Sequence, residues 1–134
     1  AETPSEDKPL SGRILIIEDN ALLREGFLLV MEAWGCIAFG ATDGEDALTL
    51  SERENWSFDA IVTDHHLGRG LTGVATVKEL ERRAERKFPT IVITGDSSAD
   101  HIADIQTSGY VVLHKPVRAE ELRSSLVRLL DVQE

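Results

Sequence analysis

The chain has 134 residues, of which 42% are hydrophobic and 28% are charged, and its formal net charge is −10 at pH 7. This length and composition predict one globular domain. The acidic balance argues against direct binding to nucleic acid, because phosphate backbones are bound by clustered lysine and arginine side chains. No apolar run approaches the roughly 20 residues of a membrane span and no signal-peptide core is present, so we expect a cytoplasmic protein that does not insert into membranes.

The beginning of the chain has the composition of a linker. Residues 1–12 are polar and include proline and glycine, which is typical of a flexible tail. We therefore expect a folded domain over residues 13–130 and a short second tail over residues 131–134.

Within that domain, short apolar runs alternate with stretches of helical periodicity. In chain order they predict a strand at 14–17, a helix at 23–34, a strand at 36–39, a helix at 43–54, a strand at 58–63, a helix at 74–84, a strand at 90–94, a short helix around 102–105, a strand at 111–114 and a helix at 120–129. Five such strand–helix units imply an α/β fold, a doubly wound sandwich around one parallel sheet. The strand runs are apolar throughout rather than alternating, as expected for strands that are covered on both faces.

Four of the five strand runs end in chemically capable residues. Glu18 and Asp19 follow the first, Asp64 the third, Thr94 the fourth and Lys115 the fifth. Taken singly, each has an ordinary explanation, such as a helix N-cap for Asp19 or a turn residue for Asp64. Because the carboxyl ends of parallel strands meet at one edge of the sheet, we expect all five residues in one crevice.

Three carboxylates in one crevice require a compensating charge. They repel by roughly 4 kcal/mol per close pair at an effective dielectric constant near 20. A hard divalent cation relieves that cost, and Mg²⁺ prefers carboxylate, carbonyl and water ligands with positions left for phosphate oxygens. Lys115 adds a positive charge for a phosphoryl oxygen, and Thr94 adds a hydroxyl donor.

Together these residues resemble the receiver domain of two-component response regulators, over residues 13–130. The resemblance rests on an acidic pair after the first strand, aspartate after the third, threonine after the fourth and Lys-Pro after the fifth. It implies a five-stranded parallel sheet in the flavodoxin-like order 2-1-3-4-5. It also implies a phosphorelay role, in which a histidine kinase or a histidine-phosphotransfer domain is the partner and the receiver catalyses its own phosphorylation and dephosphorylation.

The resemblance assigns a role to each site residue. Asp64 would accept a phosphoryl group from a phosphohistidine. Asp19, Asp64 and the backbone carbonyl of His66 would ligate Mg²⁺, and Glu18 would act largely through a metal-bound water. Lys115 would contact a phosphoryl oxygen or, before phosphorylation, Asp64.

The same resemblance predicts a switch. Thr94 would swing toward the phosphoryl group, and the face built from the fourth helix, fifth strand and fifth helix would shift between two states. The peptide bond before Pro116 is expected to be cis.

The sequence also departs from the receiver pattern. Val112 stands where many receivers carry an aromatic switch residue, and Tyr110 lies two positions earlier, on the same side of the strand but farther from the site. His66 and Asp96 occupy positions that tend to control phosphoryl lifetime, and we expect His66 to shield the group and slow its loss. Gly95 would leave room for the incoming phosphodonor.

Several interpretations of the whole protein stay open. Residues 93–97 and 113–117 look most like receivers fused to the C-terminus of hybrid sensor histidine kinases. We expect a monomer or a weak dimer. One alternative is a pseudo-receiver that docks partners without being phosphorylated. Another is a DHH-type metal phosphoesterase, because residues 64–66 spell its tripeptide signature.

Overall fold

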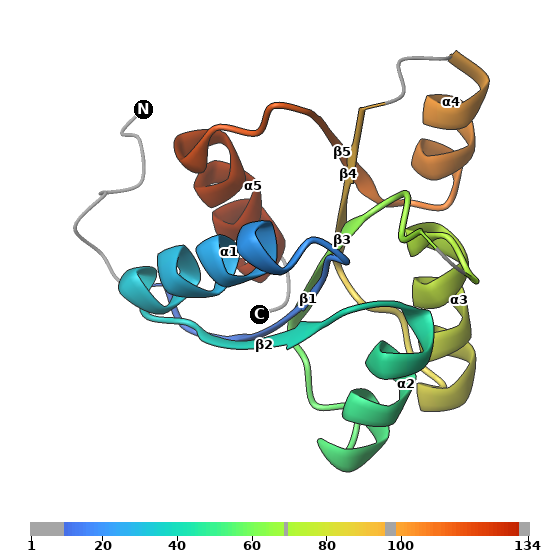
Figure 1. Ribbon diagram of the computed structural model, residues 1–134, viewed down its shortest axis with the longest axis horizontal. Coiled ribbons are helices and arrows are strands. Elements are labelled where there is room, and N and C mark those ends of the chain that lie inside the picture. Colours follow the sequence, from blue (N-terminus) through green and yellow to red (C-terminus); the bar gives the residue numbers. More distant parts are fainter. Residues whose placement is uncertain (1–9, 69, 96–98, 132–134) are drawn as a thin grey trace.

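The computed structural model describes residues 10–68, 70–95 and 99–131. A five-stranded parallel sheet in the order β2-β1-β3-β4-β5 runs through the middle of Figure 1. The predicted fold class and strand order are therefore confirmed. The strands are β1 (Arg13–Ile17), β2 (Ile37–Ala41), β3 (Ala60–Asp64), β4 (Thr90–Thr94) and β5 (Val111–His114).

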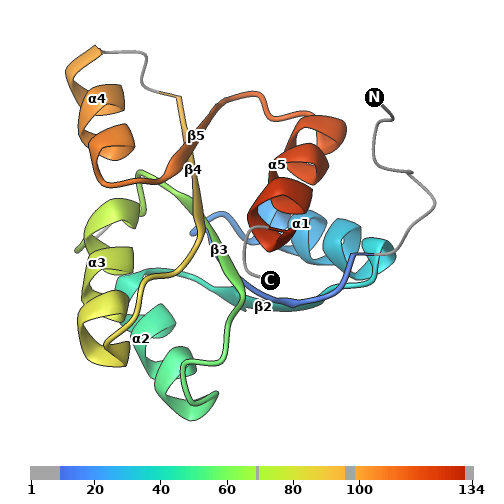
Figure 2. The ribbon, with the colours of Figure 1, turned by 180° about the vertical axis from the view of Figure 1, so that it is seen from behind.

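Helices cover both faces of the sheet, as Figures 1 and 2 show from opposite sides. On one face lie α1 (Ala21–Trp34) and α5 (Ala119–Asp131). On the other face lie α2 (Gly44–Arg53), α3 (Gly73–Ala84) and α4 (Ala99–Thr107). Within the described part of the chain, no helix has the length and apolar character needed to span a membrane.

The central strands bury side chains on both faces. In β1, Leu15 and Ile17 belong to the core under α2, α3 and α4, whereas Ile14 and Ile16 belong to the core under α1 and α5. All four side chains are at most 1% exposed. Burial of such a side chain contributes about 1.5–3 kcal/mol. Burial on both faces therefore stabilises the strands and fixes the positions of the residues at their ends.

The bounds of β1, β2 and β3 each differ from the prediction by one or two residues, and two of these differences involve buried apolar residues. Cys36 was expected in a strand, but its N–H donates to Met31 O (3.0 Å), so it lies in the turn that follows α1. Phe58 is 1% exposed yet precedes β3, which begins at Ala60 and includes Asp64. In both cases a buried apolar residue beside a strand has the same sequence signal as the strand itself.

The two described ends of the domain lie side by side. Leu10 N donates to Trp34 O (2.7 Å), so residues 10–12, which were expected in a flexible tail, pack on the domain. A Cβ atom on Gly12 would lie 3.3 Å from Leu130 Cδ2. Helix α5 continues to Asp131, one residue beyond the predicted end of the domain. Both ends meet where the strands begin, opposite the edge at which the strands end.

Candidate functional site

The loop between β1 and α1 carries two carboxylates in different environments. Glu18 is 3% exposed, and its N–H donates to Ala41 O (3.0 Å). Asn20 caps α1: its Oδ1 accepts from Leu23 N (3.0 Å), and its own N–H donates to Glu18 Oε2 (3.0 Å). Because Asn20 is the cap, the interpretation of Asp19 as the helix N-cap is wrong, and the Asp19 side chain is exposed.

The third carboxylate lies at the end of β3. Asp64 is the last residue of that strand and is 6% exposed. The next residue, His65, donates its N–H to Ile93 O (2.9 Å) and accepts at its carbonyl from Gly73 N (2.8 Å). A Cβ atom on Gly73 would overlap the carbonyl oxygen of Asp64. Helix α3 therefore begins in direct contact with the backbone that presents this carboxylate.

The three carboxylates converge as predicted. One oxygen from each of Glu18, Asp19 and Asp64 lies within 4.8 Å of the other two. At that separation, two negative charges repel by about 3.5 kcal/mol at an effective dielectric constant near 20. Burial raises the pKa of Glu18 above its usual value, and the charge on Asp64 adds to this shift. The cluster holds like charges together at a cost that a bound cation would remove.

A lysine reaches the same cluster from the β5 side. Lys115 Nζ lies 3.1 Å from Asp64 Oδ2 and is the positively charged partner of that buried carboxylate. The backbone N–H of Lys115 donates to Thr94 O (3.0 Å), and Thr94 is fully buried at the end of β4. The Lys115–Pro116 peptide bond is cis, as predicted. The carboxyl ends of β1, β3, β4 and β5 therefore bring these residues together, as expected.

The remaining candidates lie around this crevice. His66 is exposed, and its N–H makes a long hydrogen bond of 3.4 Å to Asp64 Oδ1. Gly95 is also exposed, and a Cβ atom there would lie 3.8 Å from Lys115 Cδ. Asp96 lies outside the described residues.

Neither histidine of the 64–66 tripeptide belongs to the group of potential metal ligands found among the described residues. His65 is 5% exposed, and its ring centroid lies 5.0 Å from that of His66. An all-carboxylate group is not the mixed aspartate and histidine set that a DHH phosphoesterase requires. The geometry gives that alternative no support.

Comparison with known proteins identifies the family. The model of the response regulator receiver domain matches residues 14–127. The chain belongs to this family. A curated relative is the CAI-1 autoinducer sensor kinase/phosphatase CqsS of Vibrio cholerae, which is 30% identical over 99 residues, covering 72% of this chain and 14% of the kinase. Another is the phosphate regulon transcriptional regulatory protein PhoB of Escherichia coli, which is 30% identical over 115 residues, covering 84% of this chain and 49% of the regulator.

Solved structures of receivers have the same fold. The chemotaxis protein CheY4 of Vibrio cholerae matches with a TM-score of 0.80 and 25% identity, over 90% of this chain and 100% of CheY4. A response regulator receiver domain from Clostridium thermocellum matches with a TM-score of 0.81 and 21% identity, over 90% of this chain and 95% of that domain. The present receiver spans about half of a regulator such as PhoB and a smaller share of the sensor kinase.

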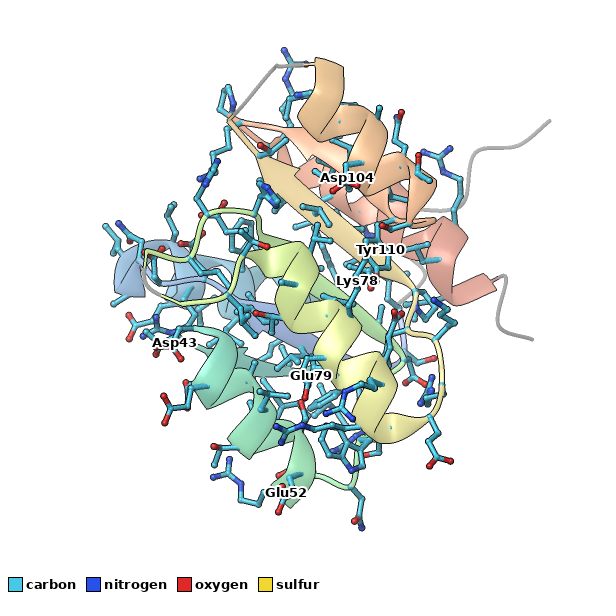
Figure 3. All side chains as sticks on the ribbon, turned by 90° about the vertical axis from the view of Figure 1, so that its right-hand side faces the viewer. Asp43, Glu52, Lys78, Glu79, Asp104 and Tyr110 are labelled. Carbon is cyan, nitrogen blue, oxygen red and sulfur yellow. The ribbon has the colours of Figure 1, made fainter. Side chains whose placement is uncertain are left out.

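The aromatic residue nearest to the usual switch position of a receiver is held away from the site. Tyr110 is 6% exposed, and its hydroxyl donates to Glu81 Oε1 (2.8 Å) on α3. Burial, together with this hydrogen bond, raises the pKa of Tyr110. In Figure 3, Tyr110, the residue before β5, lies beside α3, on which Lys78 and Glu79 are labelled. Val112, at the switch position, packs against the core under α2, α3 and α4.

A groove beside the cluster was not predicted. It has a volume of about 820 Å³ and lies between α1 and the beginning of α5, with Glu18 and Lys115 at one end. The sequence pattern of α1 indicated a helical apolar stripe, but Leu22 and Leu23 of this region are 81% and 48% exposed. The apolar residues lining the groove are Leu22, Leu23, Phe27, Val30, Ile93, Pro116, Val117, Ala119 and Leu122.

A second feature that sequence reasoning missed is Arg24. Its Nη1 donates to the backbone carbonyl of Glu18 (2.8 Å), within the acidic loop itself. An arginine in the first turns of an amphipathic helix has the sequence signal of an exposed polar position. Only the path of its side chain over β2 reveals the contact.

Proposed function

We propose that Asp64 accepts a phosphoryl group from a phosphohistidine side chain of a partner protein, in a transfer that depends on Mg²⁺. The observation that carries this proposal is the surroundings of Asp64. It is a buried carboxylate with two further carboxylates within 4.8 Å and Lys115 Nζ at 3.1 Å. A nucleophile, a potential cation site and a fixed positive charge thus adjoin one another, as phosphoryl transfer requires.

The donor set fits Mg²⁺, which prefers hard oxygen ligands. Carboxylate oxygens of Asp19 and Asp64 and the backbone carbonyl of His66 would hold the ion, and Glu18 would act through a bound water. When bound, Mg²⁺ would supply positive charge that neutralises the oxygens of the transferring group.

In the transfer, Asp64 acts as the nucleophile. One of its carboxylate oxygens forms a bond to phosphorus while the bond between phosphorus and the imidazole nitrogen breaks. The electron pair of the broken bond stays on that nitrogen, which takes up a proton. The products are an acyl phosphate on Asp64 and a neutral histidine on the partner. Lys115 Nζ, already beside Asp64, pairs with a phosphoryl oxygen.

The product then favours a second conformation. The phosphoryl group adds about −1.5 to −2 charges. The Thr94 hydroxyl and Lys115 Nζ would donate to its oxygens and draw the ends of β4 and β5 inward, which shifts the population of states of the α4–β5–α5 face. With Val112 at the switch position, this response would run through Thr94 without an aromatic rotamer change.

The groove beside the cluster suits the phosphodonor partner. Its apolar walls on α1 and the start of α5 match the apolar face of an amphipathic helix. A helix seated there would end beside Glu18 and Lys115, so a phosphohistidine on that helix would lie next to Asp64. A histidine kinase or a histidine-phosphotransfer domain supplies such a helix.

The test is phosphorylation by a small donor. The protein is incubated with phosphoramidate, whose phosphorus–nitrogen bond resembles that of phosphohistidine, and its intact mass is measured with Mg²⁺ and with a chelator. We expect a gain of one phosphoryl group with Mg²⁺ only, absent in Asp64→Asn. The matched control Asp104→Asn, at an exposed position on α4, is labelled like the parent. Labelling of Asp64→Asn, or labelling without Mg²⁺, would refute the proposal.

A negative result in all arms, repeated with a phosphorylated histidine-phosphotransfer domain as donor, would favour the pseudo-receiver alternative. The control of phosphoryl lifetime by His66 and Asp96, and the room that Gly95 leaves for the phosphodonor, are part of the proposal. Replacing both His66 and Asp96 by alanine should shorten the half-life of the acyl phosphate. The absence of direct nucleic-acid binding, the monomer or weak dimer, the cytoplasmic location and the hybrid-kinase context also stay predictions.

A further inference from the structure

Arg24 lies on α1, next to the acidic loop but outside the set of residues assigned above. We propose that Arg24 is a positioning residue, which holds the backbone of the loop so that Glu18 and Asp19 face Asp64 in the arrangement that binds Mg²⁺. The inference rests on the proposed function in taking the three carboxylates as the metal site. It adds a residue that supports the site without touching the metal or the phosphoryl group.

The first observation is that the Arg24 side chain binds the residue directly before Asp19. Its Nη1 donates to the carbonyl of Glu18 (2.8 Å). The next residue, Asp19, carries the exposed carboxylate of the cluster. On the other side of Asp19, the carbonyl of Asn20 accepts from Arg24 N (2.9 Å), which is the ordinary hydrogen bond of the first helical turn and would form with any residue at position 24. The contact that depends on arginine is therefore the one to Glu18.

The bond to Glu18 has a specific geometric consequence. The carbonyl of Glu18 belongs to the planar peptide unit that ends at the Cα atom of Asp19. A guanidinium donor fixes the orientation of this unit, and a charged donor makes a stronger hydrogen bond than a neutral one. With that peptide plane held, the direction in which Asp19 leaves the backbone is restricted.

The second observation concerns the path of the arginine side chain. A Cβ atom on Gly40 of β2 would lie 3.2 Å from both Cγ and Cδ of Arg24, and 3.1 Å from Leu28 Cδ1. Contacts this short are tighter than ordinary van der Waals packing, so a larger residue at position 40 would displace the arginine. The glycine gives the side chain a clear passage over the strand to reach the loop.

Such support matters because the three carboxylates of the cluster repel one another. Glu18, Asp19 and Asp64 hold oxygens within 4.8 Å of one another, and their mutual repulsion would drive the loop apart in the absence of a cation. Outer partners that orient ligands typically change metal affinity by about 10–100-fold when removed. Arg24 fits this role, since it acts on the backbone of the loop.

The test measures Mg²⁺ affinity and the conformation of the metal-free loop. Mg²⁺ is titrated into the protein while the backbone amide resonances of Asp19, Asn20 and Asp64 are followed by NMR. We expect Arg24→Met, which keeps an apolar stem but loses the donors, to weaken Mg²⁺ binding by about 10–100-fold and to speed amide exchange in the metal-free loop. Arg24→Lys should recover part of the affinity. Arg53→Met, at a 69% exposed side chain on α2, should bind Mg²⁺ like the parent.

A second perturbation reaches the same contact from the other side. Gly40→Ala should weaken Mg²⁺ binding in the parent by displacing Arg24, yet have little further effect in the Arg24→Met background. If Gly40→Ala acted through Leu28 instead, it would weaken binding equally in both backgrounds, and this would overturn the proposal. Unchanged affinity in Arg24→Met with a lowered melting temperature would also overturn it, since that result describes a purely structural role.

These readouts do not require phosphoryl transfer. If Arg24→Met weakens Mg²⁺ binding while Asp64 is never phosphorylated, the positioning role stands and the proposed function fails. If Asp64 is phosphorylated normally and Arg24→Met binds Mg²⁺ like the parent, the proposed function stands and the positioning role fails.

Discussion

Replacing Glu18 by glutamine tests the electrostatic account of the site. The variant keeps a side-chain oxygen that can accept from Asn20 N, but it removes a carboxylate that is 3% exposed. Its repulsion with Asp64, at no more than 4.8 Å, amounts to about 3.5 kcal/mol at an effective dielectric constant near 20. The repulsion between Glu18 and Asp19 is screened by solvent, because Asp19 is exposed. The attraction between Glu18 and Lys115 offsets part of the repulsion from Asp64.

We therefore expect Glu18→Gln to raise the free energy of unfolding of the metal-free protein by about 1–3 kcal/mol near neutral pH. When Mg²⁺ is added, we expect the parent to become the more stable of the two proteins. A ligand that binds only the folded state stabilises it in proportion to its affinity, so the parent should gain more stability from Mg²⁺ than the variant does.

The assay is urea unfolding, followed by circular dichroism, in a chelator and in excess Mg²⁺. Glu25→Gln, at an exposed position of α1, serves as the matched control and should behave like the parent in both conditions. Lower stability of Glu18→Gln than of the parent in chelator, or an equal gain of stability from Mg²⁺, would show that repulsion at Glu18 is not what the cation relieves.

Three further predictions follow from contacts around the site. Gly73→Ala should lower the free energy of unfolding by about 1–3 kcal/mol or more, because its Cβ atom would collide with the Asp64 carbonyl, and it should slow phosphorylation by phosphoramidate. Tyr110→Phe should lower the free energy of unfolding by about 1.5–3 kcal/mol, which is the contribution of a hydrogen bond to a charged group such as Glu81. Since the pKa of Tyr110 is raised in the folded state, this advantage of the parent is complete below about pH 10 and declines as the pH rises further. Leu22→Glu, in the groove, should slow transfer from a phosphorylated histidine-phosphotransfer domain but leave labelling by phosphoramidate unchanged.

Each of these has a contrary result. Normal stability and normal labelling of Gly73→Ala would mean that the start of α3 moves freely relative to Asp64. A difference between Tyr110→Phe and the parent that is constant up to strongly alkaline pH would assign the loss to packing rather than to the phenol. Equal slowing of both donors by Leu22→Glu would mean that the substitution disturbs the acidic cluster rather than the docking of a partner.

The main features of the site follow from the sequence because two simple rules coincide. Solidly apolar runs identify buried parallel strands, and the carboxyl ends of such strands meet at one edge. Asp64 and Lys115, 51 positions apart, could be predicted to meet on that basis, and their atoms lie 3.1 Å apart. Strand order and the cis bond before Pro116 followed from the resemblance to receivers rather than from the residues alone.

The features that were missed depend on what a side chain meets across the fold. The contact from Arg24 to Glu18 requires the passage over Gly40, and no local pattern in α1 signals it. The bond between Tyr110 and Glu81 joins the residue before β5 to α3 and gives the aromatic residue a structural role. The strand boundaries at Cys36 and Phe58 were misjudged because burial extends beyond the backbone ladder.

The proximity of Gly12 and Leu130 means that the domain can be joined to other proteins from one side. Its two described ends meet where the strands begin, whereas Asp64 lies at the end of β3, so flanking sequence can leave from there without crossing the acceptor site. Neighbouring ends are also the geometry that tolerates insertion into another protein and circular permutation. A permuted chain with a short bridge between residues 131 and 10, opened in an exposed loop, should keep the acidic cluster intact, and the domain could be attached by either end to a new output.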